Sequence, residues 1–172
     1  MNSFDEAMMR EALRLAEDAA RRGESPIGAV VVLGAQVIGR GQNRCEEKQS
    51  AMAHAEMIAL EEATRAKGSW RLDDCTLYVT MEPCPMCAGA LIHSRIGRVV
   101  FGVADPRAGS LGSLINLNAY PYHRHVTVEG GLLSEESGAL LTSFFEERRK
   151  KGKKAVKNTD SRTEWRIKDV SE

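Results

Sequence analysis

The sequence predicts an α/β fold, a three-layer α/β/α sandwich built around a central five-stranded mixed sheet. Segments whose apolar residues recur at helical spacing alternate with short apolar runs of strand length. A glycine-containing turn joins the first two strand segments into a hairpin. The order is helix, strand, strand, helix, strand, helix, strand, strand, helix, with room for one more helix before the last strand. This order indicates helices on both faces of one sheet.

Residues 3–22 are predicted to form an amphipathic helix. Ser3 is expected to be its N-cap, with Glu6 three residues later completing a capping box, and Gly23 is expected to end it. The segment is charged throughout, so it lacks the apolar core of a signal peptide. The apolar positions that predict the helix are Phe4, Met8, Ala12, Leu15 and Ala19.

Residues 27–33 form an almost unbroken apolar run and are predicted to be a buried strand. Gly34 and Ala35 can form a two-residue turn that leads into a partner strand at 36–43. The later elements are expected to be a helix at 53–67 that ends at Gly68, a strand at 75–81, a helix at 85–94, strands at 98–101 and 125–129, and a helix at 134–149.

The composition predicts a single soluble domain. A chain of 172 residues can bury a core without disulfides. The 28% content of charged residues and the lack of any run of roughly 18 apolar residues argue against a membrane protein. We therefore expect a cytoplasmic protein with no membrane partner. In that reducing compartment, four cysteines indicate metal binding or catalysis rather than disulfides: Cys45, Cys75, Cys84 and Cys87.

Charge is distributed unevenly along the chain, although the formal net charge is zero. The segment from Arg148 to the end holds ten basic and four acidic residues, a net charge of +6, and the rest of the chain carries −6. We expect a domain at 1–149 and a flexible basic extension at 150–172. Such an extension is either an arm that seeks a polyanion or a solvated, disordered segment.

Two short strings carry the chemistry: His54-Ala55-Glu56 and Pro83-Cys84-Pro85-Met86-Cys87. Taken alone, neither is decisive. The Cys-x-x-Cys pair is compatible with a thioredoxin-like redox site, and it is also compatible with half of a structural zinc site. In that second case Cys45, Cys75 or His93 would complete the ligand set. A lone histidine on a helix is most often a hydrogen-bonded interior residue.

The combination of the two strings predicts a catalytic zinc site. His54 offers a nitrogen, and Cys84 and Cys87, at i and i+3, offer two thiolates. Three protein ligands with an open fourth position are typical of catalytic zinc. Both His54 and Glu56 can reach one cavity only from the first turn of a helix, so two positive helix ends should converge on the metal. Glu56, which is not a ligand, is the expected general base.

The motifs resemble those of the cytidine deaminase-like superfamily and, within it, the bacterial-type tRNA-specific adenosine deaminases. The residues Glu82-Pro83 and the stretch 93–96 (HSRI) favour the tRNA enzymes. The matching segments extend to about Arg149 and include 26–32 (PIGAVVV), Asn43, 53–56 (AHAE), 76–90 (TLYVTMEPCPMCAGA), 92–102 (IHSRIGRVVFG) and 112–114 (GSL).

This resemblance implies a reaction and a cofactor. One Zn²⁺ per chain would be held by His54, Cys84 and Cys87, and Glu56 would act as a proton shuttle. The implied reaction is hydrolytic deamination of adenosine to inosine at the wobble position, position 34, of a tRNA anticodon. Zinc-activated water would attack C6 of the base.

The resemblance also implies a tRNA anticodon stem-loop as the substrate, and a homodimer. Plainer explanations exist for several of the implied contact residues. Asn43 and Asp105 can be turn residues, and at least one of Phe144 and Phe145 is expected to lie in the core. The segment from about Asn158, including Trp165, has no match. The implied substrate contacts are Ile27, Asn43, Ala55, Asp105, Phe145, Arg148 and Arg149.

Three other functions compete with this interpretation. A deaminase for a free base or nucleoside, such as guanine or cytosine, would share the zinc chemistry; the basic end of the last helix favours RNA. A thiol oxidoreductase would leave His54 and Glu56 without a role. A structural zinc module would need a fourth protein ligand.

Overall fold

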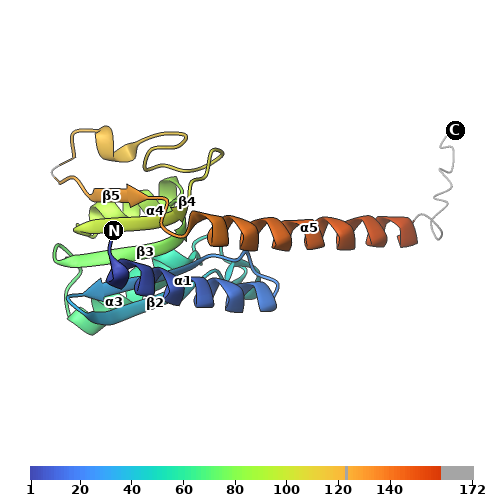
Figure 1. Ribbon diagram of the computed structural model, residues 1–172, viewed down its shortest axis with the longest axis horizontal. Helices are drawn as coiled ribbons and strands as arrows, with labels where there is room; N and C mark the ends of the chain where they lie inside the picture. Colours follow the sequence, from blue (N-terminus) through green and yellow to red (C-terminus); the bar gives the residue numbers. More distant parts are fainter. Residues whose placement is uncertain (123, 160–172) are drawn as a thin grey trace, which may run out of the picture.

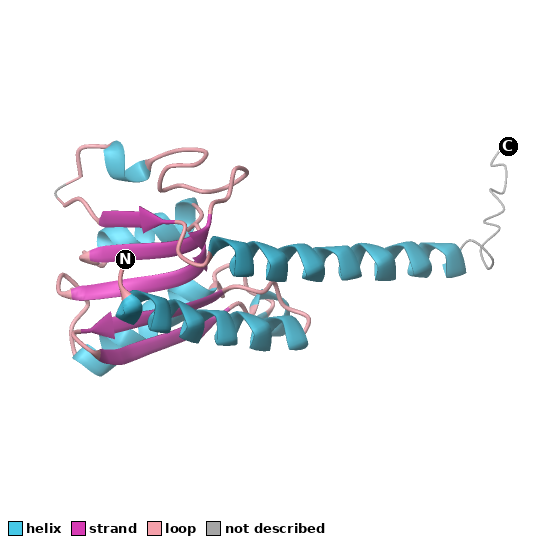
Figure 2. Cartoon of the chain, viewed as in Figure 1, coloured by secondary structure: helices cyan, strands magenta, loops and turns pink. Residues whose placement is uncertain are grey.

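The computed structural model describes residues 1–122 and 124–159. Its centre is a five-stranded sheet in the order β2-β1-β3-β4-β5 (Figures 1 and 2). β1 is antiparallel to β2 and to β3, whereas β3, β4 and β5 run parallel, so the predicted mixed sheet is confirmed. The strands are β1 (Gly28–Leu33), β2 (Gln36–Gln42), β3 (Cys75–Met81), β4 (Arg98–Val103) and β5 (Thr127–Gly130).

Helices cover both faces of the sheet, which confirms the three-layer sandwich (Figure 1). Val30 and Val32 of β1 pack toward α1, and Val31 packs toward α3, because side chains alternate along a strand. α5 contacts α1, β3 and β4, and α4 contacts α3. The helices are α1 (Ser3–Arg21), α2 (Cys45–Lys48), α3 (Ala55–Lys67), α4 (Pro85–His93) and α5 (Ser134–Thr159), with a 3₁₀ turn, η1, at Leu117–Ala119.

Two glycines of β2 allow α3 to approach the sheet closely. A Cβ atom on Gly41 would lie 1.9 Å from the carbonyl oxygen of Ala55, and one on Gly39 would lie 2.2 Å from that of Ala59. Any side chain at these positions would push α3 away from β2. These glycines therefore set the position of the first turn of α3, which carries His54 and Glu56.

The start of α1 differs from the prediction by one residue. Asn2, not Ser3, is the N-cap, and Asp5, not Glu6, completes the capping box. Asp5 is buried because it also pairs with Arg98 of β4, at 2.6 Å, and accepts a hydrogen bond from the Tyr78 hydroxyl of β3, at 2.7 Å. The tertiary partners therefore fix the register of the cap.

Several other boundaries agree with the prediction or shift by one or two residues. The Gly34 turn is confirmed, with Gly34 at a φ of +60°, and Gly68 ends α3 as predicted. The helix expected at 53–67 begins at Ala55, and the strand expected at 125–129 lies at 127–130. The short helix α2 had no prediction. It directly follows β2 and carries Cys45.

The last helix is the largest departure from the sequence prediction. It was expected to end at Arg149, but α5 continues to Thr159 and projects beyond the sheet (Figure 1). The expected boundary between domain and extension at residues 149 and 150 therefore falls inside a helix. Neither Phe144 nor Phe145 is buried, so the expectation that one belongs to the core is wrong. Trp165 lies outside the described residues.

None of the helices within residues 1–122 and 124–159 is long and apolar enough to cross a bilayer.

Candidate metal centre and substrate groove

Three potential metal ligands meet where α3 and α4 begin. His54 is the N-cap of α3, Cys84 is the N-cap of α4, and Cys87 lies in the first turn of α4. The Nδ1 atom of His54 lies 3.7 Å from Cys84 Sγ and 3.5 Å from Cys87 Sγ. All three ligand atoms lie within 4.8 Å of one another. The predicted convergence of two helix starts is thus present in the structure.

The donor set fits a zinc ion of the catalytic kind. One imidazole nitrogen and two sulfurs are typical zinc ligands, and three protein ligands leave a fourth position for water. Among the residues that the structure describes, the group contains only His54, Cys84 and Cys87. Cys45, Cys75 and His93, which were considered as a fourth ligand, do not belong to it. This arrangement disfavours a structural zinc module.

The two thiols share their protons unequally when no metal is bound. The hydrogen bond from Cys87, followed by the one from His54, lowers the pKa of Cys84 from 9.0 to about 4. Donating that hydrogen bond, together with burial, raises the pKa of Cys87. Cys84 is therefore the more easily ionised of the two thiols, and a metal that binds both as thiolates would displace their protons.

Glu56 lies next to this group without joining it. It is the second residue of α3 and is 4% exposed. Burial raises the pKa of its carboxyl group above 4.5. Its Oε2 atom is buried and accepts no hydrogen bond from the described residues. A buried carboxylate oxygen without a partner requires one, and a metal-bound water or a substrate would supply it.

Asn43 directly follows β2 and lies near the start of α3. The backbone amide of Arg44 donates to the carbonyl of Ala53 at 2.9 Å, which places Asn43 close to the start of α3. The amide of Asn43 donates to the carbonyl of Ile27 at 3.0 Å, so Ile27 and Asn43 are neighbours. Ala55 is fully buried in the first turn of α3. Ile27, Asn43 and Ala55 thus lie near the start of α3, whose N-cap is His54.

The Asn43 side chain is fixed by a residue that the sequence did not reveal. Its Nδ2 atom donates to Oε2 of Glu24 at 3.3 Å, and Glu24 is 1% exposed. The second oxygen of Glu24 accepts from the backbone amide of Glu47 at 2.8 Å. Cys45 donates its thiol hydrogen to Oδ1 of Asn43. In the sequence, Glu24 lies two residues before the stretch 26–32 (PIGAVVV), and no local pattern predicts that its carboxylate is buried.

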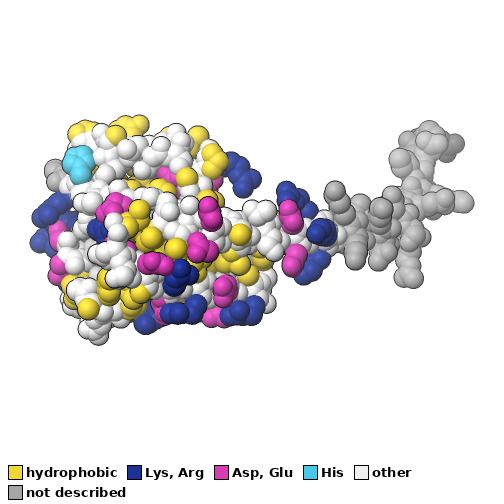
Figure 3. All heavy atoms as spheres, in the orientation of Figure 1, with side chains coloured by type: hydrophobic (Ala, Val, Ile, Leu, Met, Phe, Trp, Pro, Cys, Tyr) yellow, Lys and Arg dark blue, Asp and Glu magenta, His cyan; other side chains and the backbone are white. Residues whose placement is uncertain are grey.

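The other four implied contact residues line one groove of about 700 Å³ between α5 and the segment that follows β4. Asp105 lies on one side, and Phe145, Arg148 and Arg149 lie on the α5 side. Phe145 is 37% exposed. Basic side chains gather where α5 leaves the body, interleaved with acidic ones (Figure 3). An exposed aromatic ring beside two arginines suits the stacking of a base next to a phosphate.

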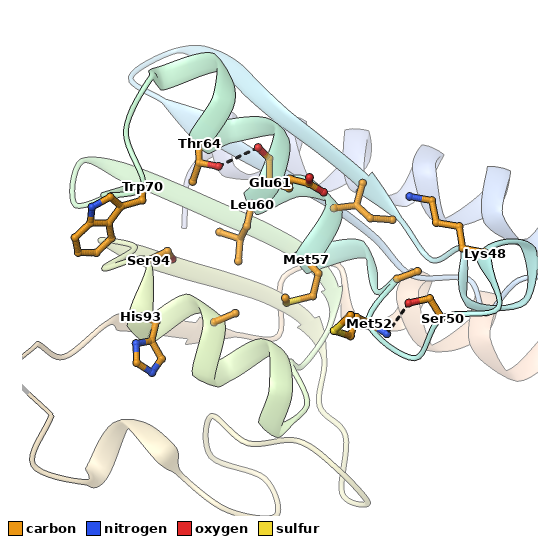
Figure 4. Close-up of a pocket in the computed structure, with 13 residues that line it drawn as sticks. Lys48, Ser50, Met52, Met57, Leu60, Glu61, Thr64, Trp70, His93 and Ser94 are labelled. Carbon is orange, nitrogen blue, oxygen red and sulfur yellow. Dashed lines mark hydrogen bonds between the residues drawn. The ribbon is translucent and has the colours of Figure 1, made fainter.

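A second groove, of about 610 Å³, lies between α3 and α4 (Figure 4). Met57 and Leu60 point into it from α3, and Trp70 and Met52 stand at its margins. Met52 is 66% exposed and Trp70 is 56% exposed. His93, once a possible metal ligand, lines this groove.

Known proteins resemble this chain over most of its length. The profile of a family described as MafB19-like deaminase matches residues 3–149. The tRNA-specific adenosine deaminase of Bacillus subtilis (strain 168) is 49% identical over 155 residues, which cover 90% of this chain and 96% of that protein.

Two solved structures extend the likeness to three dimensions. One, from work on A-to-I editing by tRNA:A34 deaminases at the wobble position of transfer RNA, has a TM-score of 0.76 and 41% identity, and the match covers 78% of this chain and 99% of that one. The other is a guanine deaminase from Nitrosomonas europaea, with a TM-score of 0.69 and 27% identity, and the match covers 81% of this chain and 83% of that one.

Proposed function

This chain belongs to the family of tRNA-specific adenosine deaminases, and on that premise we propose that it converts adenosine to inosine at position 34 of a tRNA anticodon. The observation that carries the proposal is the grouping of His54, Cys84 and Cys87 beside a buried, unpartnered carboxylate oxygen of Glu56. Both features are needed for hydrolytic deamination of a base.

We propose that His54, Cys84 and Cys87 hold one Zn²⁺ per chain. When bound there, zinc supplies an acidified water as the nucleophile. Glu56 would accept a proton with its free oxygen and deliver it to N1 of the adenine ring, and it would carry a second proton, from the hydroxyl group added at C6, to the amino group that leaves as ammonia. Asn43, held by Glu24, donates a hydrogen bond that orients the base, and Ile27 and Ala55 form the pocket wall.

The groove at α5 supports RNA rather than a free base as the substrate. A free base needs only the pocket at the metal centre. The groove adds an exposed phenyl ring and two guanidinium groups from α5, a helix whose sequence contains further basic residues. A wobble nucleotide in an anticodon loop is unpaired, so little energy is needed to turn it out. We therefore place the loop nucleotides next to position 34 in the groove formed by Asp105, Phe145, Arg148 and Arg149.

We also propose that the protein is a homodimer. The groove between α3 and α4 is largely apolar and carries exposed Met52 and Trp70, and such a surface is costly to leave in water (Figure 4). A second copy of the chain is the occupant that we assign to it. Light scattering should give twice the chain mass, and Met52→Asp should yield monomers. A monomeric wild-type protein would contradict this assignment.

The substrate is tested by measuring ammonia release from a panel. Zinc-loaded protein is mixed with an anticodon stem-loop carrying A34, with the same stem-loop carrying G34, and with free adenosine, guanine and cytosine. We expect release from the A34 stem-loop alone. Release from free guanine would instead favour the activity of the guanine deaminase that shares this fold.

A further inference from the structure

Glu82 is a buried carboxylate that none of the steps above uses. It lies between the end of β3 and Pro83-Cys84, and it is 3% exposed. Its Oε1 atom accepts hydrogen bonds from the backbone amides of Leu111, at 3.1 Å, and Ser113, at 3.0 Å. Its Oε2 atom accepts from the amide of Asp105, at 3.1 Å, and from the hydroxyl of Ser113. All of these donors belong to the segment 105–113, which has no regular secondary structure of its own.

The segment is folded tightly around this carboxylate. A Cβ atom on Gly109 would lie 2.4 Å from Oε2 of Glu82 and 2.5 Å from the carbonyl oxygen of Asp105, so only glycine fits there. Two backbone hydrogen bonds continue the attachment. The amide of Glu82 donates to Val103, and the amide of Ser110 donates to the carbonyl of Pro83, both at 2.9 Å. Four hydrogen bonds to one charged acceptor bind the segment far more firmly than its own turns could.

Glu82 therefore connects the two parts of the proposed site. On one side Glu82 is two residues from Cys84, the N-cap of α4. On the other side it holds the amide of Asp105, and Asp105, Pro106 and Arg107 form one wall of the α5 groove. No other described side chain has hydrogen bonds that link this wall to the start of α4.

We infer that Glu82 is a positioning residue that sets the distance between the wall of the substrate groove and the metal centre. The inference rests on the proposed function, because it assigns the groove to the RNA substrate. Without the carboxylate, the segment 105–113 would move away from the start of α4, while His54, Cys84 and Cys87 would keep their places. Glu82 thus governs how the anticodon loop is presented and not the chemical step itself.

The first test is Glu82→Gln, which keeps the size but turns an NH₂ group toward two hydrogen-bond donors. Arg107 is exposed in the segment 105–113, so the rate of tryptic cleavage after Arg107 measures how firmly Glu82 holds this segment, without any RNA substrate. We expect cleavage after Arg107 to be about fivefold faster or more. We expect KM for the A34 stem-loop to rise about tenfold, with kcat within about threefold of wild type and one zinc per chain. Unchanged cleavage and unchanged KM would overturn the inference.

Matched variants separate positioning from general destabilisation. Tyr78→Phe removes a buried hydrogen bond on the face of the sheet that α1 covers. It should lower the free energy of unfolding without changing KM or the rate of cleavage after Arg107. Ser113→Ala removes one donor to Glu82 and should give a smaller effect in the same direction. If Glu82→Gln does not fold, Ser113→Ala decides, and a wild-type KM there overturns the inference. Failure of the wild-type protein to deaminate the stem-loop would contradict the proposed function. Tryptic cleavage after Arg107 would still test whether Glu82 holds the segment 105–113 in place.

Discussion

At the residue scale, the chemistry depends on side chains that sit in the first turns of two helices. His54 and Cys84 are N-caps, and Glu56 and Cys87 follow within one turn, so all four face the space off the helix ends. The positive end of α4 favours the thiolate form of Cys84, its N-cap, whose pKa is lowered. The carboxyl group of Glu56 is the one member of the set that a metal does not require, which makes it the clearest probe of the proposed mechanism.

Replacing Glu56 by Gln should abolish turnover without releasing the metal. The amide has nearly the same shape but cannot accept and return a proton, so kcat should fall by about 10³-fold or more. Zinc content should stay at one per chain by elemental analysis, because Glu56 is outside the ligand group. Turnover near that of wild type in a zinc-loaded variant would exclude Glu56 as the proton carrier.

Replacing Cys87 by Ala should remove most of the zinc, because two ligands bind far more weakly than three. Cys75→Ala is the matched control, since Cys75 is equally buried but is not part of the group. It should retain one zinc per chain. Full zinc content in the Cys87 variant would mean that the ligand set is wrong.

Spacing within the sequence was enough to predict that His54, Cys84 and Cys87 come together, with Glu56 in the same first turn as the histidine. The i, i+3 cysteines and the His-x-Glu string are local features whose geometry follows from helix periodicity. Glu24 and Glu82 could not be found in the same way, because their partners are 19 to 31 residues away in the chain. A buried carboxylate is recognisable only once its hydrogen-bond donors are placed around it.

At the element scale, α1 is attached to the sheet by a polar cluster as well as by its apolar face. Asp5 pairs with Arg98, which also pairs with Glu129 of β5 at 2.7 Å. The hydrogen bond from Arg98, followed by that from Tyr78, outweighs burial and lowers the pKa of Asp5 below its usual 3.8. The apolar spacing predicted the helix correctly, but it could not predict an aspartate among its buried residues, since Arg98 is 93 positions away.

Asp5→Asn should lower the free energy of unfolding by about 3 kcal/mol at pH 7, because it leaves Arg98 without its closest partner. The folded-state pKa of Asp5 is lowered, so its contribution is present above the ordinary pKa and is lost as the pH falls below about 4. The difference in free energy of unfolding between wild type and variant, measured by urea denaturation, should therefore become smaller from pH 6 to pH 3. Asp18→Asn, in an exposed pair with Arg21, should cost less than about 0.5 kcal/mol. A gap that does not change with pH would contradict this role for Asp5.

At the scale of the whole molecule, the basic end of the chain is a projecting helix at least as far as Thr159 (Figure 1). The sequence predicted the separation of charge but not this helix, because a densely charged segment with few apolar residues was expected to be a flexible extension from residue 150. The basic residues from Lys150 to Lys157 follow Arg148 and Arg149 in the same helix, directly after the groove that we propose for the substrate. We expect these charges to make binding of RNA sensitive to salt.

Replacing Lys153, Lys154 and Lys157 by Gln should weaken binding of the stem-loop and reduce the slope of log affinity against log salt by about 2 or more. Removing residues 160–172 is the matched comparison, since that segment holds three basic and four acidic residues and should leave the slope unchanged. Measuring the affinity for the stem-loop at salt concentrations from about 50 to about 200 mM gives the slope for each protein. Equal slopes for the wild-type protein and the lysine variant would show that this part of α5 does not contact RNA.

The most direct test of the account is to map inosine in full-length tRNA that carries A34 after incubation with pure, zinc-loaded protein, with Glu56→Gln in parallel. Inosine is read as guanosine by reverse transcription, so each position is reported separately. The account predicts conversion at position 34 by the wild-type protein, none at other adenosines, and none by the variant. Unmodified A34 after treatment with zinc-loaded wild-type protein, or equal conversion by the variant, would contradict it.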